Sequence, residues 1–187
     1  DIEDYILKSS KIIQDSINIS EQIESSINLI LDCLNRGNKV VFFGNGGSAA
    51  DAQHIAAEFI GRFKLERNSL SAISLTTDSS ILTSIGNDYS FDEIFSRQCE
   101  GLIKSGDVSM GISTSGNSKN VEFGLKTSKE KGASTIALLG CDGGSIQKNV
   151  DISIIVNSND TAKIQEVHRV IYHIMCDIVE SKMALND

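Results

Sequence analysis

The chain has 187 residues and a formal net charge of −8, a balance that disfavours a nucleic-acid-binding surface, which needs a basic face. Its 40% hydrophobic and 22% charged residues are ordinary for a globular domain with a sizeable core. No apolar run approaches the length of a membrane span, so we expect neither a transmembrane helix nor a signal peptide.

The first 37 residues are predicted to form two helices. Isoleucines recur at near-helical spacing over residues 6–17, and a second apolar stripe runs over residues 23–34. Gly37 follows the second stripe and suits the left-handed conformation that ends many helices. We expect this N-terminal extension, residues 1–37 of a single domain over 1–187, to cover the sheet or to pack against a neighbouring subunit.

From residue 39 onward, apolar strands alternate with helical patterns. Continuous apolar strands separated by helices are typical of a buried parallel sheet, so the fold class is an α/β sandwich. A capping box over residues 90–93 predicts the start of a helix that runs toward Leu102. We expect strands at residues 39–43, 70–75, 108–112, 134–139 and 152–156, and helices at 48–60, 78–85, 118–131 and 161–183.

A glycine loop, residues 44–49 with the sequence GNGGSA, follows the first strand and opens a helix. It matches the GxGxxA pattern of dinucleotide-binding loops, which also require an acidic residue at the end of the next strand. That strand ends in Leu75-Thr76-Thr77 and Asp78 comes too late, so the pattern disfavours a nicotinamide cofactor. A small ligand fits better, because ligands of open α/β sheets bind beyond the carboxyl ends of the strands.

A serine loop, Ser113-Thr114-Ser115-Gly116-Asn117-Ser118, carries four hydroxyl groups at the junction between the third strand and the next helix. The free N–H groups and the positive dipole end of a helix bind anions, and hydroxyl groups add neutral donors. The loop therefore indicates a site for the phosphate of a small molecule. The alternative is an N-cap loop without a ligand, because serine and asparagine are preferred N-cap residues.

His54 and Glu58 lie four residues apart on the alanine-rich helix that follows the glycine loop, so they share one face. Such a pair can hold zinc, can act as acid and base, or can be an ordinary surface pair. The last helix carries Gln165 and His173 about 12 Å apart along its axis, a long span for two ligands of one ion. His168 lies about 140° around the helix from His173, which favours a structural or indirect role.

Other features have ordinary structural explanations. Asn87-Asp88 is typical of a polar turn before the capping box, and residues 140–144 indicate a tight exit from a strand. The cysteines lack metal-site spacing, so we expect buried free thiols in a reducing compartment rather than disulfides. They are Cys33, Cys99, Cys141 and Cys176. Proline is absent, and only 5% of the residues are aromatic.

Together these residues resemble the sugar isomerase (SIS) domain family, and most closely its phosphoheptose isomerases. The similarity rests on the glycine loop and its helix, on residues 85–88 and 95–97, on the serine loop and on the last helix, in family order. The serine-loop motif is typical of SIS domains in general. Its combination with the GNGGS sequence and with four polar side chains is much narrower. These four are His54, Glu58, Gln165 and His173.

The resemblance implies a three-layer α/β/α sandwich with a five-stranded parallel sheet, assembled as a cytoplasmic homotetramer with sites at subunit interfaces. It implies an isomerase that converts sedoheptulose 7-phosphate to D-glycero-D-manno-heptose 7-phosphate through an enediol. That reaction is the first step toward the ADP-heptose or GDP-heptose of lipopolysaccharide or another surface glycan. Neither a nucleic acid nor a membrane is an expected partner.

The resemblance also assigns roles to residues. Glu58 and His173 would be catalytic. One Zn²⁺ per subunit would be held by His54, Glu58, Gln165 and His173. Substrate would be bound by Asn45, Gly46, Gly47, Ser48, Glu58, Asn87, Asp88, Ser113, Thr114, Ser115, Ser118 and Gln165.

Two other functions fit the same family. One is a non-enzymatic SIS protein that senses a phosphosugar or associates with a replication initiator. The other is an isomerase of a different phosphosugar. An enzyme is favoured by the presence of Glu58, His173, His54 and Gln165, because a scaffold has no chemical need for them.

Overall fold

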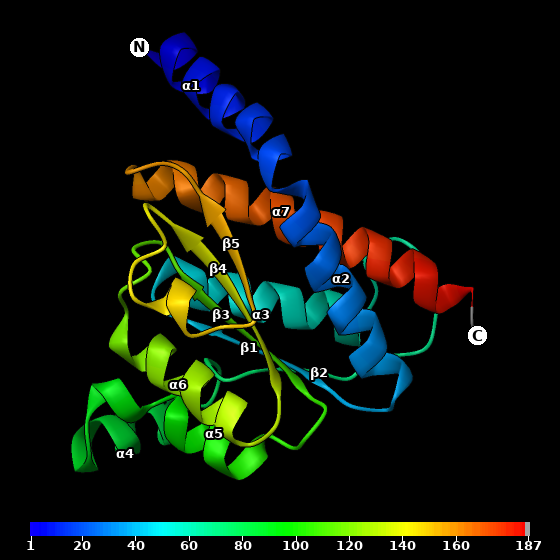
Figure 1. Ribbon diagram of the computed structural model, residues 1–187, viewed down its shortest axis with the longest axis vertical. Helices are drawn as coiled ribbons and strands as arrows, with labels where there is room; N and C mark the ends of the chain where they lie inside the picture. The colour runs from blue at the N-terminus through cyan, green and yellow to red at the C-terminus, as the bar shows by residue number, and fades with distance from the viewer. Residues whose placement is uncertain (186–187) are drawn as a thin grey trace.

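The computed structural model of the chain describes residues 1–185 and shows a five-stranded sheet between two layers of helices (Figure 1). All strand pairs are parallel, in the order β2-β1-β3-β4-β5. The predicted three-layer architecture is confirmed. The predicted domain, 1–187, extends two residues beyond the described part. The strands are β1 (Val40–Gly44), β2 (Ala72–Ser74), β3 (Val108–Ser113), β4 (Ser134–Gly140) and β5 (Ile152–Val156).

Successive strand residues face opposite helical layers, as the pleat of a strand requires. In β1, Phe42 belongs to a core shared with the first layer, whereas Phe43 belongs to a core shared with the second. The first layer consists of α2 (Ser20–Asn35), α3 (Gly47–Ile60) and α7 (Thr161–Ala184). The second consists of α4 (Ser79–Asp88), α5 (Ser96–Leu102) and α6 (Lys119–Glu130). Both faces of the sheet are therefore covered, which explains its continuous apolar strands.

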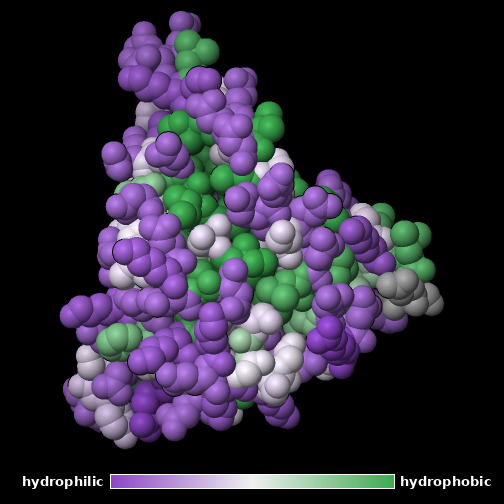
Figure 2. Space-filling model, in the orientation of Figure 1, coloured by the Kyte–Doolittle hydropathy of each residue, from purple (hydrophilic) through white to green (hydrophobic). Residues whose placement is uncertain are grey.

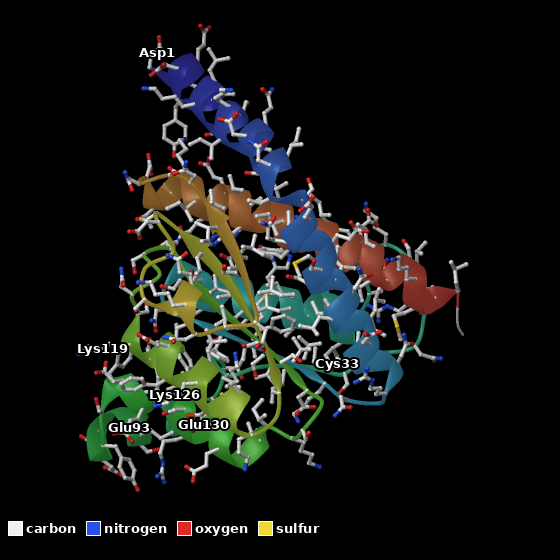
Figure 3. The ribbon with its side chains drawn as sticks, viewed as in Figure 1. Asp1, Cys33, Glu93, Lys119, Lys126 and Glu130 are labelled. Atoms are coloured by element: carbon white, nitrogen blue, oxygen red, sulfur yellow. The ribbon has the colours of Figure 1, made fainter. Side chains whose placement is uncertain are left out.

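The two N-terminal helices differ in their role. Helix α2 packs its isoleucine stripe against the sheet, and Gly37 ends the segment with a φ of 77°, as predicted. Helix α1 (Ile2–Asp15) buries no residue and extends beyond the body of the molecule, with Asp1 at its tip (Figures 1 and 3). The 3-10 turn η1 (Ser16–Ile19) joins the two helices. Of the two N-terminal helices, α2 therefore covers the sheet and α1 does not.

The largest errors of the sequence prediction lie between β2 and β3. Helix α4 extends to Asp88, so Asn87-Asp88 ends a helix instead of forming a turn. The expected capping box opens only the 3-10 turn η2 (Phe91–Glu93), in which the Ser90 hydroxyl accepts a hydrogen bond from the N–H of Asp92. Helix α5 begins separately at Ser96. Strand β2 is also shorter than the six residues expected.

The cysteines are free thiols, as predicted. Cys33, Cys99 and Cys176 are buried, whereas Cys141 is only half-buried, at a φ of 54° in the turn after β4. Beyond this turn lies the 3-10 turn η3 (Ile146–Lys148).

Candidate active site at the switch point of the sheet

The glycine loop and the serine loop lie at the same edge of the sheet, after the neighbouring strands β1 and β3. Strands β1 and β3 are neighbours in the sheet, yet the chain leaves β1 toward β2 on its other side. Such a switch point opens a crevice at the carboxyl ends of the strands. Asn45 of the glycine loop and Asn120 of α6 join the two loops by reciprocal amide hydrogen bonds of 2.8 and 2.9 Å. The two loops therefore lie side by side, and a crevice that both of them face stays a prediction.

The serine loop is folded by its own polar groups. The hydroxyl oxygens of Ser113 and Ser118 are 3.0 Å apart, and the N–H of Asn117 donates to the Ser115 hydroxyl at 3.2 Å. Gly116 adopts a φ of 67°, a left-handed conformation that glycine reaches without strain. Ser118 occupies the N-cap of α6 but makes no side-chain capping bond. Only one of the Ser113 and Ser118 hydroxyls can donate within their pair, so the other keeps a proton to donate to a ligand at the start of the helix.

The glycine turn after β4 supports the serine loop from behind. The N–H of Ile146 donates to the Gly116 carbonyl at 3.1 Å, and the N–H of Ser145 donates to Asn117 Oδ1 at 3.0 Å. A side chain at Gly116 would collide with the backbone of Gly143. The sequence analysis explained residues 140–144 only as a strand exit and missed this contact.

The glycine loop brings the start of α3 against the last helix. Gly46 occupies the N-cap of α3 with a φ of 55°. A Cβ atom at Gly47 would lie 2.7 Å from Nε2 of Gln165, so the missing side chain makes room for the glutamine. Ser48 is buried in the first turn of α3. Gln165 therefore lies beside the glycine loop.

His54 and Glu58 form a pair on α3, as their spacing predicted. Nε2 of His54 lies 2.9 Å from Oε1 of Glu58, and the two side chains are 39% and 21% exposed. His173 of α7 packs beside them, with its ring centroid 5.2 Å from that of His54. Phe63 stacks on His173 at 5.5 Å. An imidazole, a carboxylate and a second imidazole therefore meet between α3 and α7.

A hydrogen-bond network of the buried Asp51 and Tyr172 and the exposed Arg169 lies behind this pair. The Tyr172 hydroxyl donates to Oδ1 of Asp51 at 3.1 Å and lies 3.1 Å from Nδ1 of His54. Arg169 donates through Nε to the Tyr172 hydroxyl at 3.1 Å and through Nη2 to Asp51 at 3.3 Å. Burial and the charge of Asp51 raise the pKa of Tyr172 to about 12, so its hydroxyl keeps its proton. The sequence analysis missed Tyr172 and Arg169, although both lie one helical turn from His168 or His173.

The segment after α3 is anchored by a second buried pair. Glu180 accepts hydrogen bonds of 2.8, 2.6 and 2.9 Å from the N–H groups of residues 63–65. Nε of Arg67 lies 3.3 Å from Glu180, and both side chains are 1% exposed. Arg67 also donates to the backbone carbonyl of Glu58 at 2.8 Å. The pair therefore holds both the backbone of Glu58 and the segment that carries Phe63, and the sequence analysis did not single it out.

Not every predicted site residue joins this group. Asn87 and Asp88 lie exposed at the end of α4, where the Asn87 amide donates to Asp88 at 2.8 Å. Gln165 contacts the glycine loop rather than His173. His168 faces the sheet, with Nε2 2.9 Å from the Leu139 carbonyl. The burial of His168 agrees with the expected structural or indirect role, whereas the shared site of Gln165 and His173 stays a prediction.

The two histidines of α7 have depressed pKa values. Burial lowers the pKa of His168 to about 4, against the opposing effect of its bond to Leu139. Burial, and then the neighbouring His54, lower the pKa of His173. Both rings are therefore favoured in the neutral form near neutral pH, and a neutral imidazole can donate and accept at the same time.

The donor types around His54 suit a zinc ion, which takes imidazole nitrogen and carboxylate oxygen. Within residues 1–185, no group of three or more His, Cys, Asp or Glu side chains is placed to hold a metal ion. The single chain therefore brings two of the four implied ligands, His54 and Glu58, within bonding distance of each other.

None of the helices within residues 1–185 is long and apolar enough to cross a lipid bilayer.

The doubly covered parallel sheet, two small-residue loops at its switch point and a carboxylate–imidazole group on the helix after the first loop define a sugar isomerase (SIS) domain. The SIS domain family matches residues 4–140. A phosphoheptose isomerase of Geobacter sp. (strain M21) is 58% identical over 167 residues, which cover 89% of this chain and 87% of that protein. The chain belongs to the SIS domain family and, within it, to the phosphoheptose isomerases.

Solved structures agree with this assignment. The phosphoheptose isomerase of Neisseria gonorrhoeae superposes with a TM-score of 0.91 at 43% identity, covering 96% of this chain and 97% of that one. The phosphoheptose isomerase of Francisella tularensis superposes with a TM-score of 0.93 at 34% identity, covering 96% of each chain.

Proposed function

We propose that the chain converts sedoheptulose 7-phosphate to D-glycero-D-manno-heptose 7-phosphate, with Glu58 as the base. The observation that carries the proposal is the meeting of Glu58, His54 and His173, with Glu58 and His54 on the helix that the glycine loop opens. An aldose–ketose isomerase needs one group that moves a proton between adjacent carbons and one that moves a proton between their oxygens. Both kinds of group are present.

The phosphate of the substrate binds in the serine loop. Ser113, Ser115 and Ser118 offer hydroxyl donors, and the start of α6 adds its helix dipole. Thr114 extends the same loop. The Asn45–Asn120 pair fixes this loop relative to the glycine loop, so the sugar chain is directed toward α3. Anchoring one end of the substrate orients its carbonyl end without further ordering at the moment of reaction.

Glu58 and His173 carry the two proton movements. Glu58 removes a proton from C1 of the ketose while O2 accepts a proton, which gives the enediol. The same carboxylic acid returns a proton to C2 while O1 loses its proton, which gives the aldose. His173 moves the oxygen-bound protons, because its depressed pKa favours a ring that both donates and accepts. The atoms balance, since substrate and product are isomers.

His54, Glu58, Gln165 and His173 would hold one Zn²⁺ per subunit. Bound there, the ion would act as a Lewis acid toward the oxygens of the reacting carbons. The proposal is supported by the donor types and by the 2.9 Å approach of His54 to Glu58. Exhaustive treatment with a chelator should lower turnover, and zinc should restore it. Full activity in protein shown to be metal-free by elemental analysis would remove zinc from the proposal.

The chain also acts as a cytoplasmic homotetramer in this proposal. Free thiols suit a reducing compartment. The exposed apolar residues of α1 suit burial against another subunit. Asn87, Asp88 and Gln165 lie apart from the His54–Glu58 pair, and a subunit interface would bring substrate-binding residues of two chains to one site.

The decisive experiment is turnover of sedoheptulose 7-phosphate by the Glu58→Gln variant. The amide keeps the shape of the side chain but cannot take a proton, so we expect kcat to fall by about 10²- to 10⁴-fold. In heavy water, the wild-type product should carry deuterium at C2. Glu130→Gln is the matched control, because Glu130 lies on the outer face of α6 beside Lys126 and is 64% exposed (Figure 3).

The outcomes separate the competing functions. Near wild-type turnover by Glu58→Gln would refute the assignment of the base. Turnover of a pentose phosphate in preference to the heptose would indicate an isomerase of another phosphosugar. Phosphosugar binding without turnover in the wild-type protein would indicate a sensor or scaffold.

A further inference from the structure

The ring of His54 has a polar neighbour at each nitrogen. Nε2 faces Glu58 at 2.9 Å, and Nδ1 faces the Tyr172 hydroxyl at 3.1 Å. A neutral imidazole carries one proton, on one nitrogen or the other, and the hydrogen bonds of the ring decide which. The hydrogen bonds around Tyr172 determine whether Nδ1 carries the proton of the ring.

A tyrosine hydroxyl donates one hydrogen bond and accepts through its lone pairs. Nε of Arg169 lies 3.1 Å from the Tyr172 hydroxyl and can only donate to it. Asp51, a carboxylate paired with the same guanidinium at 3.3 Å, can only accept. The hydroxyl proton therefore goes to Asp51, and a lone pair of the oxygen remains for His54. Nδ1 of His54 must donate to that lone pair.

Burial decides between the two sides of the ring. Tyr172 is 0% exposed and Asp51 is 3% exposed, so a bare Nδ1 facing the hydroxyl would leave two acceptors in contact, one of them a buried oxygen. Glu58, in contrast, has a side chain that is 21% exposed and can turn toward water. An unprotonated Nδ1 facing the Tyr172 oxygen therefore costs more free energy than an unprotonated Nε2 facing Glu58. The Tyr172 ring also packs edge-on against His54 at 5.5 Å and fixes its plane.

We propose that Tyr172, oriented by Asp51 and Arg169, is a positioning residue that keeps a proton on Nδ1 of His54 and so presents Nε2 as the metal-binding nitrogen. The zinc part of this inference rests on the proposed function, whereas the position of the proton does not. A hydrogen bond from the remote nitrogen of a ligand histidine fixes its tautomer and orientation, and its loss typically costs 10- to 100-fold in metal affinity.

The position of the proton can be read by solid-state ¹⁵N NMR of full-length, metal-free protein labelled with ring-¹⁵N histidine. The chain has three histidines, and His54→Gln identifies the His54 signals by their loss. The spectrum is recorded at about pH 9, well above the ordinary imidazole pKa of about 6.5. His168 is an internal standard of the opposite kind, because its Nε2 must donate to the Leu139 carbonyl.

We expect the wild-type protein to show a protonated Nδ1 at His54. In Tyr172→Phe the acceptor is gone, and we expect the proton to move to Nε2, where Glu58 accepts it. Tyr5→Phe is the matched control, since it removes the exposed hydroxyl that donates to Glu166, and it should leave the His54 signals unchanged. A bare Nδ1 in the wild-type protein, or a protonated Nδ1 that persists in Tyr172→Phe, would overturn the inference.

Zinc affinity, measured by competition with a chromophoric chelator, tests the consequence. We expect binding about 10- to 100-fold weaker in Tyr172→Phe and unchanged in Tyr5→Phe. Equal affinities in Tyr172→Phe and the wild-type protein would contradict a positioning role. A wild-type protein that binds no zinc and converts no heptose phosphate would refute the proposed function, while the ¹⁵N spectrum would still decide the position of the proton.

Discussion

His168 shows how a single buried side chain can make stability depend on pH. The residue is 0% exposed, and Nε2 donates to the backbone carbonyl of Leu139 in β4. Nδ1 has no hydrogen-bond partner within the described residues, so a second proton there would be both buried and unpaired. The folded protein therefore binds this proton only near pH 4, well below the ordinary imidazole value of 6.5.

The free energy of unfolding should fall by about 3 kcal/mol as the pH is lowered from 6.5 to about 4. In that range the unfolded chain binds a proton at His168 and the folded chain does not, so acid favours unfolding. Urea denaturation at a series of pH values measures the effect. The His168→Gln variant keeps a donor for Leu139 and should lose most of this slope. An unchanged slope in His168→Gln would show that other groups cause it.

At the scale of elements, the serine loop depends on one glycine. Gly116 combines a left-handed φ of 67° with direct contact to the backbone of the turn after β4. Gly116→Ala should lower the free energy of unfolding by about 2–5 kcal/mol, the sum of left-handed strain and overpacking. Gly37→Ala is the matched control, because Gly37 has a φ of 77° but a Cβ atom added there would meet no other atom within 4 Å.

Strain alone should cost Gly37→Ala about 1–2 kcal/mol. Thermal or urea unfolding of both variants gives the comparison. Gly116→Ala should also raise KM for the heptose phosphate, because the serine loop must shift away from Gly143. Equal destabilisation of the two variants would mean that the contact between Gly116 and the turn after β4 contributes nothing to the free energy of unfolding.

The Arg67–Glu180 pair ties the segment after α3 to the last helix. Glu180→Gln would place an amide donor against three backbone N–H groups and leave Arg67 buried without its counter-charge. We expect a loss of about 3–5 kcal/mol in the free energy of unfolding. Asp177→Asn, which removes the exposed Lys64–Asp177 pair from the same helix, should cost less than about 1 kcal/mol. Comparable losses would contradict the importance of burial.

Acid should weaken the same pair. Burial alone would raise the pKa of Glu180, but the N–H groups of residues 63–65 and the charge of Arg67 hold it below its ordinary value. A carboxylate with a depressed pKa stabilises the fold fully above the unfolded value, about 4.3, and loses that effect as the pH falls further. This contribution therefore lies at lower pH than most of the His168 contribution.

The regular elements could be predicted because their signals are local. Strand β5 lies where its apolar run placed it, at Ile152–Val156, and the His54–Glu58 pair follows from helical spacing alone. The end of helix α4 could not be predicted, because a polar Asn87-Asp88 pair suits a turn and a helix end equally well. In the site, Asn45–Asn120 and His54–Tyr172 join segments far apart in the chain. No spacing rule connects such residues, so only the fold reveals them.

At the scale of the whole molecule, apolar surface gathers along α1 and where α2 crosses α7 (Figure 2). A groove of about 420 Å³ lies there, lined by Ile23 and Ile27 of α2 and by Ile174 and Ile178 of α7. Ile174 and Ile178 are 40% and 38% exposed, and apolar side chains that are exposed together often mark a protein–protein interaction site. It fits the homotetramer of the proposed function.

Charges placed in this groove should dissociate the assembly. We expect light scattering to report a tetramer for the wild-type protein and smaller species for the Ile174→Asp/Ile178→Asp variant, because unpaired carboxylates oppose burial at an interface. Phe123→Asp is the control, since Phe123 is 41% exposed on α6 in the opposite layer. A monomeric wild-type protein would refute the tetramer.

The strand order has a consequence for how the chain acquires its structure. Val40 of β1 pairs with Val108 of β3, so the centre of the sheet cannot form until the intervening chain has been gathered in. Folding that depends on such distant pairings is slow, because the entropy of closing a long loop is lost before the pairing stabilises anything. The chain contains no proline, so prolyl isomerisation contributes no slow phase. The rate of a slow refolding phase that is independent of protein concentration would therefore report the pairing of β1 with β3. The rate of a concentration-dependent phase would report the association of subunits.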